Sequence, residues 1–267
     1  MKNIRETEAI ALHVKSEDPG IKAHRQEVCE RVRDYFVNNF RVPAELRALC
    51  FFDDQDAPEV RAYFGGPVTR GVHWPIKGQG LMVWPSYMRN VVAPIDHFSP
   101  DALRWPFASV IYLHESTCEE DVGLTITLAH ELQHFLQYAN ERRLWAINTL
   151  LMNLPGLPAK DLEAMWDIPI EREARIVAKQ VAESLYGGDR VRQHALERMD
   201  AHVTDNDVKD WEFFQGVDSS MPYCLTDATK PLVERYKTEL KVLLQQPEFK
   251  DDPDFSVIDL DSAGCLE

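Results

Sequence analysis

Two histidines four residues apart, with a glutamate directly after the first, form the stretch of this chain best suited to chemistry. His130, Glu131 and His134 make the pattern H-E-x-x-H. On an α-helix, residues four apart lie on one face with Cβ atoms about 5–6 Å apart. Both imidazoles can therefore bind a single zinc ion (Zn2+) at about 2.0–2.1 Å. Zinc lowers the pKa of a bound water toward about 7, and a nearby carboxylate can accept its proton. The spacing predicts a zinc hydrolase with His130 and His134 as ligands and Glu131 as general base.

The segment that carries this motif has the pattern of an amphipathic helix. Its histidines fall together on a strip beside the apolar face, and we expect the helix to run on toward Leu151 before residues 153–158 break it. The alternative interpretation is a helix with two half-buried structural histidines bonded to neighbours. The apolar face is predicted from residues at three- and four-residue steps: Leu124, Leu128, Leu132, Phe135, Leu136 and Ala139.

A catalytic zinc needs a third protein ligand and keeps one open position. The extended pattern H-E-x-x-H-x-x-G-x-x-H fails, because its last position is Asn140. A second helix beginning near Pro169 offers two acids instead. Glu173 borders the apolar stripe of that helix and is the predicted ligand, whereas Glu171 is expected to be a solvated acid of the first turn. The remaining alternatives are His114, His194 and His202.

Together, these residues resemble a known group of metallopeptidases. Residues 127–134 (T-L-A-H-E-L-Q-H), followed by residues 171–174 (E-R-E-A), are similar to the T-L-A-H-E-L-x-H … E-x-E-A signature of the ImmA/IrrE-type metallopeptidases, within the gluzincins. The resemblance covers roughly 60 residues, 124–182. It implies that His130, His134 and Glu173 bind zinc and that Glu131 is the general base.

The elements before the motif are predicted to be one helix and several short strands. Residues 21–39 have the spacing of an amphipathic helix, and residues 44–49 are expected to add a short one. Residues 109–114 form the clearest strand. By resemblance to zincin-like folds, this strand would border the cleft and pair with an extended substrate backbone. Glycines punctuate the intervening apolar runs and predict further strands at 61–64, 71–74 and 81–84.

Helical periodicity dominates after the motif and predicts the organisation of the rest of the chain. The helices are expected at 160–165, 169–187, 191–199 and 230–244. The predicted fold is α+β and zincin-like, with a small, mostly antiparallel sheet beside the H-E-x-x-H helix and a mainly helical C-terminal half. We expect a single domain over residues 1–246, made of parts 1–108, 109–187 and 188–246. Residues 247–267 are rich in aspartate and predict a flexible acidic tail.

Charge and composition restrict the partners and the compartment. The net charge is −15, and no basic cluster supplies the face that a nucleic-acid binder usually carries, so no nucleic acid is expected as a partner. No apolar run is long enough for a membrane span, and the N-terminus lacks a signal-peptide core, which predicts a cytoplasmic protein. Five scattered cysteines without a C-x-x-C pair indicate reduced thiols.

The predicted function is a zinc metallopeptidase acting on a protein or peptide substrate. By the resemblance, that substrate could be a regulatory protein of a stress or mobile-element switch. The alternative is a zinc-stabilised interaction or sensor module with little proteolytic activity. A third hypothesis is a zinc hydrolase that does not act on peptides. Glu131 favours an enzyme, since a binding module needs no general base. The sequence does not single out the group that stabilises the oxyanion among His194, His202, Tyr186 and Tyr223.

Overall fold

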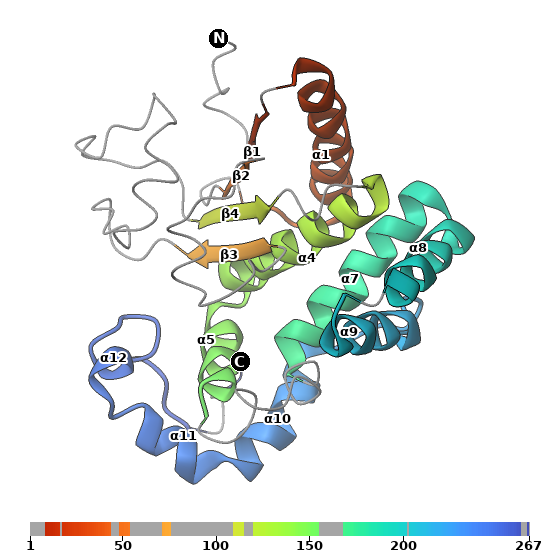
Figure 1. The fold of residues 1–267 in the computed structure, drawn as a ribbon. Helices are drawn as coiled ribbons and strands as arrows, with labels where there is room; N and C mark the ends of the chain where they lie inside the picture. Colours follow the sequence, from red (N-terminus) through yellow and green to blue (C-terminus); the bar gives the residue numbers. More distant parts are fainter. Residues whose placement is uncertain are drawn as a thin grey trace, which may run out of the picture. The chain divides into compact units, whose positions relative to one another are not determined.

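The computed structural model describes residues 9–16, 18–43, 48–53, 71–75, 109–114, 120–154, 168–201, 203–262 and 266. Helices make up most of these residues (Figure 1). The chain divides into two compact units, Met1–Phe135 and Leu136–Glu267. The boundary falls inside helix α4 (Asp121–Asn140), so the last turn of that helix belongs to the second unit.

The first unit contains a four-stranded sheet in the order β1-β2-β4-β3. Strands β1, β2 and β4 are parallel to one another, and β3 runs antiparallel to β4. The predicted zincin-like class with a mostly antiparallel sheet is therefore wrong, since two of the three described pairings are parallel and helices dominate. The strands are β1 (Ile10–Lys15), β2 (Ala48–Asp53), β3 (Gly71–Pro75) and β4 (Ser109–His114).

Strand β4 lies inside the sheet and not at its edge. Ser109 pairs with Ala48 of β2 on one side and with Pro75 of β3 on the other, and the same double pairing continues to Leu113. A strand paired on both sides has no free row of backbone groups for a third strand. The prediction that residues 109–114 pair with a substrate backbone is therefore wrong.

Helix α1 (Pro19–Asn39) follows β1 and supplies the crossover to the parallel strand β2. Asp18 caps it, because its carboxylate accepts hydrogen bonds from the backbone N–H groups of Gly20 and Ile21 at 2.7 and 3.1 Å. Val28, Val32 and Phe36 are buried along one face, and α1 contacts β1. The predicted helix over residues 21–39 is confirmed.

The short-strand predictions have mixed outcomes. The strands at 71–74 and 109–114 are confirmed. The helix predicted over 44–49 is wrong at its end, because β2 begins at Ala48. The predicted strands at 61–64 and 81–84 and the helix at 160–165 lie outside the described residues.

The motif helix is almost wholly buried. Only Gly123, His130 and Ala139 are partly accessible between Val122 and Ala139. The predicted continuation into residues 142–151 is a separate helix, α5 (Arg142–Met152), because Glu141 leaves the helical region at φ −134° and ψ 45°. A helix that is buried on nearly all sides forms part of a core and does not lie across a surface.

The second unit is built from helices packed on one another. Helix α7 contacts α5, α8, α9 and α10, and α10 and α11 also contact α5. Gly187, with φ 84°, ends α7 in a backbone conformation that other residues rarely adopt. The helix at 205–216 had no sequence prediction. The helices are α7 (Pro169–Tyr186), α8 (Gly188–Ala201), α9 (Asp205–Gly216), α10 (Leu225–Arg235), α11 (Lys237–Leu243) and α12 (Pro247–Lys250).

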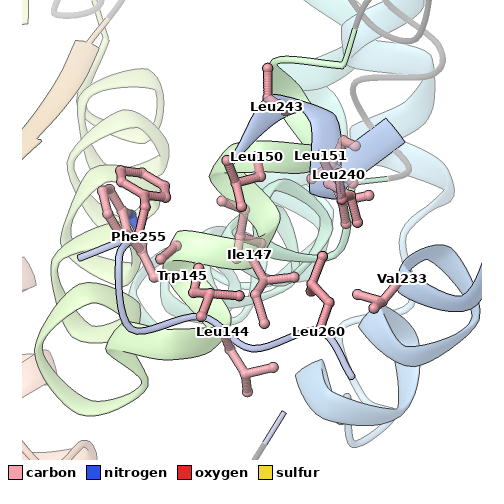
Figure 2. Close-up of a cluster of buried hydrophobic side chains, with 14 of the residues drawn as sticks. Leu144, Trp145, Ile147, Leu150, Leu151, Val233, Leu240, Leu243, Phe255 and Leu260 are labelled. Atoms are coloured by element: carbon pink, nitrogen blue, oxygen red, sulfur yellow. The ribbon is translucent and has the colours of Figure 1, made fainter. Parts of the chain in front are cut away.

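The C-terminal segment packs into the core of this unit. Phe255 and Leu260 lie against α5 residues such as Trp145 and Ile147 (Figure 2). The buried carboxylate of Asp254 pairs with Arg142. The expectation of a flexible tail is therefore wrong for residues 247–262, because apolar side chains alternate with the acids and outweigh the charge pattern.

Tyr138 shows the same packing from the side of α4. The Arg142 guanidinium lies 5.0 Å from the centre of its ring. Burial raises the pKa of the Tyr138 phenol to about 12, and the charge of Asp254 adds to the shift. The end of α4, the start of α5 and the C-terminal segment thus share one environment.

None of the helices in the described part of the chain combines the length and the apolar composition that a membrane span requires.

Replacing Phe255 by alanine should lower the free energy of unfolding by about 3–5 kcal/mol, since a buried aromatic ring is lost and leaves a cavity. Phe255 is 2 % exposed, whereas Val257 is 65 % exposed. Val257→Ala is therefore the control and should change stability by less than about 0.5 kcal/mol. Urea unfolding of both variants measures the difference, and equal stabilities would show that the segment is not part of the core.

Candidate metal centre

A row of buried polar side chains runs along helix α4. Glu131 and His134 are each 7 % exposed, and Gln137 is 2 % exposed. A buried polar group is costly unless it has partners, so such a row is retained where it binds something or holds the structure together. His130, His134 and Gln137 share one face, since their spacings of four and three residues each correspond to about one helical turn.

The two histidines of the motif point their Nε2 atoms at each other. These atoms are 3.0 Å apart, and the ring planes are nearly perpendicular, at 86° with centroids 4.6 Å apart. For a hydrogen bond between them, one ring must carry its proton on Nε2 and donate it as N–H to the unprotonated Nε2 of the other, so the two rings are different tautomers. With both protons on Nδ1, the same two atoms can bind one cation. Tetrahedral zinc ligands at about 2.0–2.1 Å lie roughly 3.3–3.4 Å from each other, so only a small rotation of the rings is needed.

A carboxylate completes the set. Among the residues that the structure describes, His130, His134 and Glu171 form a group in which one ligand atom of each lies within 4.8 Å of the others. Two imidazoles and one carboxylate are a donor set that suits zinc. The residues present therefore fit a zinc ion by number, type and convergence.

The last turn of α4 is attached to the first turn of α7 by one side chain. The Gln137 amide donates a hydrogen bond to the backbone carbonyl of Ile170 at 2.9 Å and another to Oε2 of Glu173 at 2.8 Å. All three residues belong to the unit that begins at Leu136. The attachment fixes the beginning of α7 against the last turn of α4 within that unit.

Glu173, the ligand predicted from the sequence, is thus bound to Gln137. It also faces another acid: partial desolvation raises the pKa of Glu141, and the neighbouring Glu173 carboxylate raises it further. Glu173 as a zinc ligand stays a prediction. The expectation that Glu171 is a solvated surface acid is wrong, because that residue is only 9 % exposed.

Glu171 lies in a buried charge network. Its Oε2 accepts a hydrogen bond from Nη1 of Arg175 at 2.8 Å, and Nη2 of Arg175 reaches Oδ1 of Asp210 at 3.2 Å. Burial lowers the pKa of the Arg175 guanidinium, but the two carboxylates outweigh this effect and hold the pKa above its ordinary value. Arg175 therefore stays charged. The pair of Glu171 and Arg175 could be predicted from its i, i+4 spacing. The contact with Asp210 could not, because that residue lies on another helix.

Within the described part of the chain, the other candidates from the sequence are not in the group of His130, His134 and Glu171. His194 is buried, with its ring 5.2 Å from that of Trp211, which indicates packing. Tyr223 packs against the core around α5, and Tyr186 is half-buried at the end of α7. His202 and the side chain of His114 lie outside the described residues.

A second group of potential ligands consists of Glu120, His194 and Glu197. Glu197 is exposed and Glu120 is half-buried. Exposed acids of this kind commonly lie together without an ion, and we assign the group no role.

Comparisons of the chain with protein-family models, with curated proteins and with solved structures found no match. The resemblance to the ImmA/IrrE-type metallopeptidases therefore rests on residues 127–134 and 171–174 alone.

Replacing Gln137 by methionine should lower the free energy of unfolding by about 1–3 kcal/mol, because one buried and one half-buried acceptor on α7 lose their donor. Gln193→Met is the matched control. Gln193 makes a 2.8 Å bond to Glu197 on the exposed face of α8, so its loss should cost less than about 0.5 kcal/mol. Thermal or urea unfolding compares the two, and similar small losses would show that Gln137 does not hold α7.

Proposed function

We propose that this chain is a zinc-dependent hydrolase that cleaves a peptide bond in a protein or peptide substrate. The observation that carries the proposal is the convergence of the His130 and His134 Nε2 atoms, 3.0 Å apart, in one group with the carboxylate of Glu171. Glu131, buried beside them on the same helix, is the proposed general base.

The proposed ligands come from two helices. His130 and His134 supply neutral imidazoles from α4, each with its proton on Nδ1. The third ligand is a carboxylate from the first turns of α7, and Glu171 is favoured over Glu173 by its place in the group. When bound, zinc would act as a Lewis acid that polarises the substrate carbonyl and lowers the pKa of a water molecule.

Glu131 would move the proton. Its carboxylate would accept a proton from the attacking water. It would then donate that proton to the nitrogen that leaves when the C–N bond breaks. The side chain of Glu131 is buried. The same burial excludes bulk water from the carboxylate.

Two further considerations favour a peptidase. The H-E-x-x-H pattern places a glutamate where a hydrolase needs a base, and a zinc-stabilised binding module would gain nothing from a buried carboxylate there. The resemblance of residues 127–134 and 171–174 to a metallopeptidase signature points to the same reaction.

Replacing Glu131 by glutamine tests the base. The purified unmodified protein should contain about one zinc per chain, and the variant should retain it, because the side chain is not a ligand. Cleavage of a substrate found by a peptide-library screen should fall by a factor on the order of 10² or more. Metal content is measured by elemental analysis and cleavage by mass spectrometry.

The possible outcomes separate the two functional classes. Zinc at one equivalent with no cleavage by the unmodified protein would favour the binding module. Zinc below a tenth of an equivalent, with no recovery on adding the metal, would reject the whole proposal. Activity that survives in the Glu131→Gln variant would remove Glu131 from the mechanism.

The third ligand is tested by comparing two matched variants, Glu171→Gln and Glu173→Gln. Both keep the shape of the side chain and remove one charge from α7. Glu171→Gln should weaken zinc binding at least ten-fold in chelator competition, because a neutral amide is a poor zinc ligand. Glu173→Gln should stay within a few-fold of the unmodified protein if Gln137 is its main partner. The opposite order would identify Glu173 as the ligand.

A further inference from the structure

We propose that Arg175 is a positioning residue for the metal centre: it holds Oε2 of Glu171, so that Glu171 binds the metal through Oε1 alone. Residues of helix α9 hold Arg175 in turn. The inference rests on the proposed function, since it concerns the carboxylate assigned as the third ligand.

The contacts of Arg175 leave its guanidinium little freedom. Nη1 donates to the Glu171 carboxylate at 2.8 Å and to the Glu171 backbone carbonyl at 3.2 Å. Nη2 pairs with Asp210 of α9 at 3.2 Å. The ring of Phe213, one turn further along α9, lies 5.9 Å from the guanidinium carbon. A side chain held from three directions fixes the group that it binds.

Burial gives these contacts their effect. The side chains of Glu171 and Arg175 are 11 % and 12 % exposed, and that of Asp210 is 28 % exposed. Removing one member of a buried ion pair is much more costly than losing an exposed one. The planar fork of arginine can also join two carboxylates at once, which lysine cannot do with the same geometry. The arrangement therefore orients Glu171 and balances one of the two negative charges.

Positioning and simple electrostatics predict opposite effects when Arg175 is removed. Without its positive charge, the site becomes more negative and should attract a cation more strongly. Without its hydrogen bonds, the Glu171 carboxylate is free to rotate and must be ordered when the metal binds. Groups that orient a metal ligand typically contribute 10–100-fold to metal affinity. The direction of the change therefore identifies the role.

The experiment measures zinc affinity by chelator competition in the full chain, for Arg175→Met, Arg175→Lys and Arg172→Met. Arg172 is the matched control, because it lies on the same helix, 5.7 Å from the same Phe213 ring, and its side chain is exposed. Arg175→Met should bind zinc at least ten-fold more weakly than the unmodified protein. The zinc affinity of Arg175→Lys should lie between those two, and that of Arg172→Met should stay within two-fold of the unmodified protein. Affinity in Arg175→Met that equals or exceeds that of the unmodified protein would overturn the proposal.

A spectroscopic measurement distinguishes positioning from a general loss of stability. Cobalt(II) replaces zinc, and its visible absorption becomes weaker when the coordination number rises above four. Release of Oε2 in Arg175→Met should let both oxygens of Glu171 bind, so the absorption per bound cobalt should fall. A spectrum unchanged from that of the unmodified protein would contradict the proposed coordination through Oε1 alone.

Two further comparisons keep the test decisive. If Arg175→Met does not fold, Asp210→Asn replaces it. This variant should both weaken zinc binding and alter the cobalt spectrum. A pure charge effect would leave the spectrum unchanged. If the unmodified protein binds no metal, the proposed function fails. If the unmodified protein binds one zinc and the Arg175 variants bind it equally well, only the positioning role fails.

Discussion

The hydrogen bonds of Gln137 are the constraint on which the candidate site depends. One buried amide connects the last turn of α4 to the Ile170 carbonyl and the Glu173 carboxylate of α7. The histidines lie on the same face of α4, and the acids that compete for the third ligand position lie within the first turns of α7. That connection holds the first turns of α7 against the last turn of α4.

Charge then distinguishes the two acids of α7. Glu171 is paired with Arg175, whose charge is balanced in part by Asp210 of α9. Glu173 instead receives a neutral amide and faces Glu141, whose raised pKa reflects its desolvation and the repulsion between the two carboxylates. Each acid accepts a hydrogen bond through its Oε2, so the bonds alone do not decide between them. Glu171, and not Glu173, has an oxygen in one group with the two histidines.

The sequence predicted the parts of the structure that depend on local spacing. Helix α1, helix α7 and the strands at β3 and β4 follow from apolar periodicity, caps and turn residues, which act over a few positions. Strand direction was predicted wrongly because pairing joins distant segments. Strand β1 carried no prediction, and β2, which pairs with β4 on the side opposite β3, begins within residues that were predicted to be helical. The acidic C-terminal segment was also misread, since the burial of Phe255 and Leu260 depends on the surface that α5 offers them.

The sequence by itself determined the chemistry that is available. The spacing of His130, Glu131 and His134 places two imidazoles and a carboxylate on one helix, and this holds in any fold that keeps the helix. Only the tertiary structure showed which acid has an oxygen in one group with the two histidines. The periodicity of α7 favoured Glu173, at the edge of the apolar stripe, but the first turn of α7 is itself buried, so Glu171 is not left in water. Its partner Asp210 lies on a different helix, and contact between helices depends on packing that no local pattern records.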